Sequence, residues 1–166
     1  YVLKFEGLKN VPPQGPYIIC SNHTSWFDPP LIGSLPAGGQ KVNFMAKEEL
    51  FKLFLIGPIF NKLKAFPVKR NTADRKAIRR AMQVLEDGEI LGLFPEGTRV
   101  RSGELGKPYH GAALIALKSK KPVLPVAIEW PPGLFQPVKI NVGALIYFTE
   151  GGKIKGNVLE KVSVQI

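Results

Sequence analysis

Two side chains able to do acid–base chemistry, His23 and Asp28, lie in one short stretch, residues 21–30 (SNHTSWFDPP). The apolar run 17–20 before it is typical of a buried strand, and 29–35 after it is typical of a short helix started by proline. In a regular helix, residues five apart point about 140° away from each other, so a turn must bring the pair together. A carboxylate on one imidazole nitrogen would leave the other free to take a proton from a hydroxyl.

This pair is half of a hydrolase triad, because no nucleophilic side chain accompanies it. The attacking oxygen would then belong to a substrate hydroxyl, and the reaction class would be acyl transfer by general-base catalysis. A proline follows Asp28 and disfavours helical dihedrals at that residue. The alternative is that His23 satisfies backbone groups at a strand end while Asp28 only caps the helix.

A second polar junction, Pro95–Arg99, follows another apolar run. In open α/β sheets, ligands bind beyond the carboxyl ends of the strands. Gly97 allows a close backbone approach, Thr98 can donate to an anionic oxygen, and the planar fork of Arg99 matches a phosphate. Arg70, at the end of another predicted strand, could converge on the same anion. The alternative is a turn that carries a surface arginine.

The elements that must position these residues alternate between strands and helices. Predicted strands cover 2–5, 17–20, 42–46, 65–70, 89–94, 122–128 and 138–148, and predicted helices cover 29–35, 47–64, 73–87 and 110–120. The segment 162–166 also alternates like a strand. This order predicts a single α/β domain over residues 1–166, with a largely parallel or mixed central sheet flanked by helices.

The helix predicted at 73–87 has clear end signals, with Thr72 as its cap and Gly88 as its stop. Its inward face is predicted to consist of apolar residues at helical spacing, namely Ile78, Met82 and Leu85. Its cations are read as a solvated face, because no aromatic side chains interleave with them as a nucleic-acid site would require. No nucleic-acid partner is therefore expected.

The interval 47–64 is the most hydrophobic part of the chain, and Gly57-Pro58 interrupts its helical spacing. We expect a helix broken or kinked at Pro58. Lysines flank its apolar residues, as they do in helices that lie on a membrane surface. The alternative is a helix that packs on the sheet.

Composition narrows the choice of partners. With 166 residues and 45% hydrophobic content the chain can bury one core. Its net charge of +10 favours an acidic partner, which could be nucleic acid, an anionic membrane surface or a phosphorylated substrate, and charge alone does not choose among them. The single cysteine, Cys20, excludes an intramolecular disulfide and offers no zinc cluster. A reducing compartment is expected on the side of the catalytic residues.

The four polar or proline-containing segments together resemble the glycerolipid acyltransferase family, which includes 1-acyl-glycerol-3-phosphate acyltransferases. The matching segments are Asn22–Asp28 (NHxxxxD), Phe66–Arg70, Phe94–Arg99 (FPEGTR) and Val123–Val126, which occur in the order of the family. The second segment is the loosest match.

The resemblance implies that His23 deprotonates the free hydroxyl of a lysophospholipid, that Asp28 orients the imidazole, and that the hydroxyl attacks an acyl thioester. It implies that Arg70 and Glu96–Arg99 hold the phosphate side of the acceptor, with Glu96 positioning the loop or a cation. It places Pro125 in the acyl pocket. It implies no metal and no cofactor, with acyl-CoA or acyl-carrier protein as the donor substrate.

Members of this family work at membranes, often through hydrophobic N-terminal helices. The chain begins at Tyr1 without a signal peptide, and the expectation is a domain that lacks an N-terminal membrane-associating segment. Peripheral or anchored membrane association is expected, with the active site on the cytoplasmic side. Two alternatives stay open: the same machinery acting on glycerol 3-phosphate or another lysophospholipid, and a basic lipid-binding module without catalysis.

Overall fold

The chain alternates between strands and helices along most of its length. The strands are β1 (Leu3–Glu6), β2 (Ile18–Ser21), β3 (Val42–Lys47), β4 (Phe66–Val68), β5 (Ile90–Leu93), β6 (Val123–Glu129) and β7 (Val138–Val142). The helices are α1 (Asp28–Gly33), α2 (Glu48–Phe51), α4 (Arg75–Glu86), α5 (His110–Ser119) and α6 (Gly156–Gln165), with a 3-10 turn, η1, at Leu8–Asn10. A computed structural model describes residues 2–52, 54, 60, 63–69, 74–99, 106, 108–131, 136–148 and 156–165.

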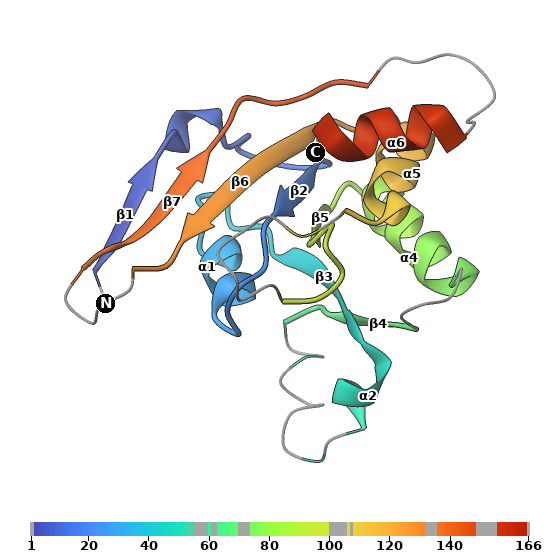
Figure 1. The fold of residues 1–166 in the computed structure, drawn as a ribbon, viewed down its shortest axis with the longest axis horizontal. Helices are drawn as coiled ribbons and strands as arrows, with labels where there is room; N and C mark the ends of the chain where they lie inside the picture. The colour runs from blue at the N-terminus through green and yellow to red at the C-terminus, as the bar shows by residue number, and fades with distance from the viewer. Residues whose placement is uncertain are drawn as a thin grey trace.

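The seven strands form one sheet in the order β1-β7-β6-β2-β5-β3-β4 (Figure 1). β6 and β7 pair antiparallel, and the other neighbouring strands pair parallel. The predicted α/β domain with a mixed sheet is therefore confirmed. Because β2 lies between β5 and β6, the segments that leave the carboxyl ends of these three strands emerge at one edge of the sheet.

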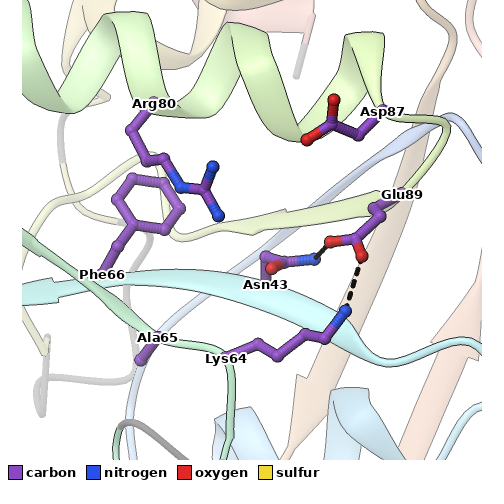
Figure 2. A pocket seen from close by; sticks show the side chains of 7 residues that line it. All are labelled: Asn43, Lys64, Ala65, Phe66, Arg80, Asp87 and Glu89. Atoms are coloured by element: carbon purple, nitrogen blue, oxygen red, sulfur yellow. Dashed lines mark hydrogen bonds and ion pairs between the residues drawn. The ribbon is translucent and has the colours of Figure 1, made fainter.

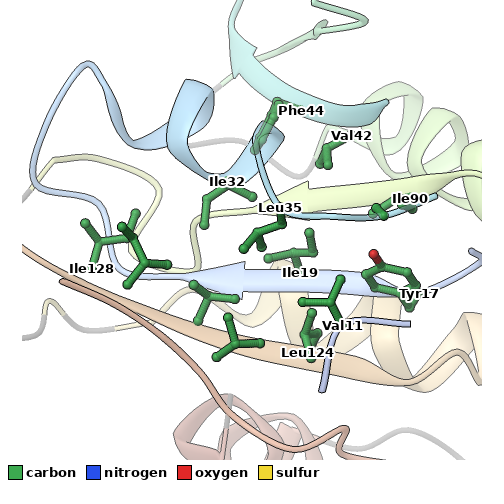
Figure 3. Close-up of a cluster of buried hydrophobic side chains, with 14 of the residues drawn as sticks. Val11, Tyr17, Ile19, Ile32, Leu35, Val42, Phe44, Ile90, Leu124 and Ile128 are labelled. Carbon is green, nitrogen blue, oxygen red and sulfur yellow. The ribbon is translucent and has the colours of Figure 1, made fainter. Parts of the chain in front are cut away.

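The central strands are apolar on both faces because both faces are covered. Ile18 and Cys20 of β2 lie in one core cluster together with residues of α4 and α5. Tyr17 and Ile19, which alternate with them, point to the opposite cluster. Figure 3 shows this second cluster, where α1 covers the sheet with Ile32. Burial on both faces explains why the strands read as continuous apolar runs.

Pro125 lies within β6 in the middle of the sheet, where a proline normally removes a ladder hydrogen bond. Its carbonyl oxygen accepts a hydrogen bond from Gly143 N at 2.9 Å, so the side of Pro125 that lacks an N–H faces Gly143. β7 ends at Val142, one residue earlier, and its strand pairing stops there. The backbone N–H that Pro125 lacks would therefore lie beyond the end of the antiparallel pairing between β6 and β7, so no hydrogen bond of that pairing is lost.

Three local predictions are corrected by the structure. The side chain of Asp74 caps α4 by accepting from Lys76 N and Ala77 N, and Thr72 lies outside the described residues. The strand expected at 138–148 ends at Val142, because the chain then keeps only an isolated bridge between Ile146 and Val123. Residues 162–165 of the segment that alternates like a strand belong to helix α6.

Packing explains why two of these helices differ from their predicted pattern. The most buried side chains of α4 are small or close to the sheet, namely Ala77, Ala81, Val84 and Leu85, while the predicted Ile78 and Met82 are only partly buried at the margin of the same cluster. In α6, Val162 is buried against α5 together with the partly buried Val158 and Leu159. Because these three residues have helical spacing and pack on α5, the segment forms a helix and not the strand that its short alternation suggested.

The hydrophobic interval 47–64 is described only in part. Residues 48–51 form α2, whereas Lys47 ends β3. The expected kink at Pro58 lies outside the described residues. Phe54 is 91% exposed and Leu63 is 44% exposed, so these two apolar side chains face solvent. Within the described part of the chain, no helix has the length and hydropathy needed to cross a membrane.

The buried Cys20 thiol provides a test of this core. Cys20 is 2% exposed, and burial raises the pKa of its thiol far above the ordinary value. We expect the native protein to react with Ellman's reagent only at the rate at which it unfolds, and one thiol to react rapidly in guanidinium chloride. Rapid labelling of the native protein would contradict the burial of β2.

Candidate active site

The turn after β2 brings His23 and Asp28 together. His23 Nδ1 lies 2.9 Å from Asp28 Oδ2, which confirms the predicted pairing. The same oxygen accepts hydrogen bonds from the backbone N–H groups of Thr24 and Ser25, both at 2.7 Å. Three donors therefore converge on one carboxylate oxygen, and they shape the turn that presents the imidazole.

The other carboxylate oxygen of Asp28 is bound from a distant part of the chain. Trp130 Nε1, just after β6, donates to Oδ1 at 2.8 Å. Burial alone would raise the pKa of the Asp28 carboxyl, but the hydrogen bonds from His23, Ser25 N, Trp130 and Thr24 N together hold that pKa below its ordinary value of 3.8. The carboxylate is therefore charged although its side chain has 0% exposure.

Asp28 is the first residue of α1, so the expectation that Pro29 would keep it out of a helical conformation is wrong. Phe27 is the N-cap and makes no side-chain capping hydrogen bond, while its carbonyl accepts from Leu31 N at 3.0 Å. A proline in the first turn removes no helical hydrogen bond, and the contacts of the Asp28 carboxylate fix the local backbone. The carboxylate serves the turn and the imidazole instead of capping the helix.

The hydrogen bonds of the carboxylate determine the tautomer of His23. An ionised carboxylate only accepts, so the proton of a neutral imidazole must sit on Nδ1 and Nε2 carries the free lone pair. No described residue forms a hydrogen bond to Nε2. The His23 side chain is 13% exposed. Nε2 can therefore act as a base toward a group that enters from solvent.

The ring of His23 is held from its flat side by Phe94, the first residue after β5. The two ring centroids are 4.1 Å apart with an interplanar angle of 22°. Phe94 in turn stacks on Phe44 of β3, with centroids 6.0 Å apart. A Cβ at Gly92 would collide with the Phe44 ring, so a glycine is needed in β5 for this arrangement. Three strands thus fix the plane of the imidazole.

Asn22 ties the beginning of the turn to β6. Its side-chain Nδ2 donates to Ile128 O at 2.9 Å, and Ile128 N donates to its Oδ1 at 2.8 Å. The amide side chain therefore replaces a backbone peptide and continues the β2–β6 pairing beyond Ser21. This clamp lies immediately before His23 in sequence.

The Phe94–Arg99 segment leaves β5 beside this turn. Gly97 N donates to Phe94 O at 2.9 Å, and Gly97 has a φ of 63°, in the left-handed region that glycine tolerates. A Cβ there would come within 3.0 Å of the Tyr109 ring. Glu96 is buried, and its Oε1 accepts from Gly106 N at 3.2 Å, so this carboxylate contacts the following loop.

Arg99 is brought to the His23 turn through an aromatic ring. Its guanidinium carbon lies 3.8 Å from the centroid of the Trp26 ring, in a cation–π contact. Trp26 is 56% exposed, and Thr98 is also exposed. The two predicted junctions therefore meet, and the positive charge of Arg99 lies in the same loop cluster as His23.

Two other predicted site residues are not placed with this cluster. Arg70 lies outside the described residues. Pro125 pairs with Cys20 in the β2–β6 register and has Gly143 on its other side, within the sheet. Sequence reasoning assigned no site role to Trp130 or Phe94. The only signal for Trp130 was its position just beyond the end of a predicted strand. The signal for Phe94 was its place in the FPEGTR segment.

A polar cavity of about 310 Å³ lies at the opposite, amino-terminal edge of the parallel strands (Figure 2). Its lining residues are Asn43, Lys64, Ala65, Phe66, Arg80, Asp87 and Glu89. Glu89 is paired with Lys64 and accepts from Asn43 Nδ2 at 2.9 Å. No predicted site residue lines this cavity. Across the described residues, no three His, Cys, Asp or Glu side chains group as a metal site would need.

Comparisons with known proteins agree on one family. Residues 2–129 match the family model described as Acyltransferase. The chain is 34% identical over 131 residues to the 1-acyl-sn-glycerol-3-phosphate acyltransferase of Bacillus subtilis (strain 168), covering 78% of this chain and 63% of that protein. It is 33% identical over 120 residues to the lyso-ornithine lipid O-acyltransferase of Pseudomonas aeruginosa, covering 71% and 45%.

A solved structure of an acyltransferase is similar to this chain. The crystal structure of the 1-acyl-sn-glycerophosphate (LPA) acyltransferase PlsC from Thermotoga maritima is similar with a TM-score of 0.72 and 30% sequence identity. The similarity covers 99% of this chain and 70% of that chain. The chain thus spans less than two thirds of the length of the Bacillus relative, 63%, and a slightly larger share of the solved structure.

The buried charge of Asp28 predicts a pH-dependent stability. Because its pKa is lowered in the folded state, ionised Asp28 stabilises the fold above about pH 4, and this contribution is lost as pH falls through the folded pKa. Asp28→Asn should lower the free energy of unfolding by about 2 kcal/mol or more at neutral pH. The gap between the two proteins should narrow at acid pH.

Urea titrations at successively lower pH measure this gap. Glu6→Gln is the matched control, because Glu6 is 57% exposed in its ion pair with Lys4, and it should change stability little at any pH. A gap for Asp28→Asn that stays constant with pH would contradict the assignment of an ionised, hydrogen-bonded carboxylate.

Proposed function

This chain belongs to the Acyltransferase family, and from that premise we propose that it transfers a fatty acyl group from an acyl thioester to the free hydroxyl of 1-acyl-glycerol 3-phosphate, giving phosphatidate. One observation carries the proposal: a buried, ionised Asp28 binds Nδ1 of His23 and leaves Nε2 open to a substrate. No described serine or cysteine hydrogen-bonds this imidazole. The nucleophile is therefore assigned to the acceptor.

In the proposed reaction, Nε2 of His23 takes the proton of the acceptor hydroxyl as its oxygen attacks the thioester carbonyl. Asp28 stabilises the imidazolium that forms, as the aspartate does in a hydrolase triad. When the tetrahedral intermediate collapses, the carbon–sulfur bond breaks and the proton passes from Nε2 to the leaving thiolate. The products are an ester and a free thiol, and the imidazole returns to its starting form.

The phosphate of the acceptor is proposed to lie at the Phe94–Arg99 loop. Arg99 supplies the charge and the planar fork, and Thr98 is exposed beside it as a hydroxyl donor. Gly97 is proposed to admit the headgroup close to the backbone. Glu96 is proposed to act through the loop, since its Oε1 accepts from Gly106 N. A contribution from Arg70 and an acyl pocket beside Pro125 complete this proposal.

Besides glycerol 3-phosphate, the acceptor has one further competing candidate. A relative at 33% identity is named for acylation of lyso-ornithine lipid, so the same base could serve a lysolipid that lacks this phosphate. The cationic Arg99 favours the phosphate-bearing acceptor. Turnover measured over a panel of lysophosphatidate, glycerol 3-phosphate and lyso-ornithine lipid separates them, and each should be offered with acyl-CoA and with acyl-carrier protein.

The protein is further proposed to work at a membrane surface, with its active site on the cytoplasmic side. The exposed Trp26 and Phe27 lie in the His23 turn, and Phe54 follows α2 with 91% exposure. Aromatic side chains of this kind favour the interface between headgroups and acyl chains. The net charge of +10 adds attraction to anionic lipids.

Removing the base tests the reaction. His23→Ala should lower the turnover number by about a thousandfold, because general-base catalysis is worth that order, while folding is retained. Free-thiol release in the presence of donor and acceptor measures it. The control is His110→Ala, which replaces the other of the two histidines of the chain at an exposed position. Turnover retained by His23→Ala would refute the assignment of His23 as the general base. If the wild type bound anionic vesicles but released no thiol, the result would favour a lipid-binding module without catalysis.

Removing the guanidinium tests the phosphate assignment. Arg99→Ala should raise the KM for lysophosphatidate about tenfold or more and leave the KM for the donor nearly unchanged. Arg99→Lys should recover part of the loss, since it keeps the charge without the fork. Arg79→Ala on the exposed face of α4 serves as the control for net charge. An unchanged acceptor KM would remove Arg99 from the phosphate site.

A further inference from the structure

The carboxylate of Asp28 is bound on its two oxygens by two different parts of the chain. Oδ2 receives its donors from His23, Thr24 and Ser25, all within five residues. Oδ1 receives the indole N–H of Trp130, which is 102 residues away in sequence, at 2.8 Å. The rotation of the carboxylate about its Cβ–Cγ bond therefore depends on a residue that follows β6.

Trp130 is itself fixed in position. Its ring packs against the core cluster that contains Ile128 and Leu124, and it lies 6.3 Å from the Phe27 ring. Two residues before it, Ile128 forms the paired hydrogen bonds with Asn22. β6 and the residue that follows it therefore bind the His23 turn at two places: Ile128 binds Asn22, and Trp130 binds Asp28. These contacts oppose movement of the indole with a rotating carboxylate.

We propose that Trp130 is a positioning residue of the acyl transfer, whose indole N–H holds Oδ1 of Asp28 so that Oδ2 stays directed at Nδ1 of His23 while the imidazole gains and loses its proton. The inference rests on the proposed function, because Trp130 acts through the base. An indole N–H only donates, so it satisfies a carboxylate without offering the imidazole a competing acceptor. Without it, a fully buried Oδ1 turns toward another donor and carries Oδ2 away from His23.

The first test is a split between kinetic constants. Trp130→Phe should lower the turnover number about tenfold or more, whereas the KM values for acceptor and donor should change less than about twofold. Tyr147→Phe is the control, an exposed aromatic residue that loses one polar atom and should leave both constants unchanged. Protection of the Cys20 thiol verifies that the variants are folded. Full turnover by Trp130→Phe would overturn the proposal.

An isostere separates the N–H from the shape of the ring. The chain has two tryptophans, so in a Trp26→Phe background Trp130 alone takes up a fed analogue. Replacing it with 3-benzothienylalanine puts sulfur in place of the N–H and keeps the bicyclic ring. Turnover should fall about tenfold relative to the same background with tryptophan. Equal turnover would assign the effect to packing and overturn the proposal.

A spectroscopic measurement tests the contact without an assay of activity. In a ¹H–¹⁵N spectrum, the indole proton of Trp130 should exchange with solvent far more slowly than that of Trp26, which is 56% exposed, and Asp28→Asn should shift it. Equal exchange rates would overturn the proposal. A wild type that acylates no acceptor would overturn the proposed function and the role of Trp130 with it, whereas an active wild type with a fully active Trp130→Phe variant would overturn the role of Trp130 alone.

Discussion

A charged carboxylate with no access to water must be satisfied by the protein around it, and this constraint organises the candidate site. Asp28 accepts four hydrogen bonds, from His23, Thr24 N, Ser25 N and Trp130. Removing such donors leaves a buried charge unpaired, at a cost of several kcal/mol. The turn after β2 and the end of β6 must therefore both be in place before the imidazole has its orientation.

The parallel pairing of β6, β2 and β5 makes this arrangement accessible. Parallel neighbours end at the same edge of a sheet, so the segments carrying Trp130, His23 and Phe94 emerge side by side. Trp130 supplies the donor to Oδ1, His23 supplies the imidazole, and Phe94 supplies an aromatic surface for that ring. The proposed chemistry needs all three, and the cavity at the other edge contributes to none of them.

Sequence patterns predicted an element correctly where neighbouring residues alone decide its structure. The apolar runs of β2, β3 and β5 and the stop at Gly88 are set by neighbouring residues, and all were predicted within a residue or two. The cap of α4 went to Asp74 because a carboxylate there reaches two helical N–H groups. The α6 segment became a helix because its apolar residues find α5, a contact that no short window of sequence contains.

By itself, the sequence predicted the candidate chemistry: a histidine and a carboxylate that only a turn could pair, no accompanying nucleophile, and a second junction whose residues could hold a phosphate. It also predicted the order of strands and helices from β1 to β7, but not helix α6. The tertiary structure alone decided that Trp130 completes the bonding of Asp28, that Phe94 fixes the imidazole plane, and that Arg99 stacks on Trp26. These contacts join residues about 70 to 100 positions apart. They depend on the order and register of the strands. Order and register are fixed only when the whole chain has packed, because both faces of the sheet must then be buried.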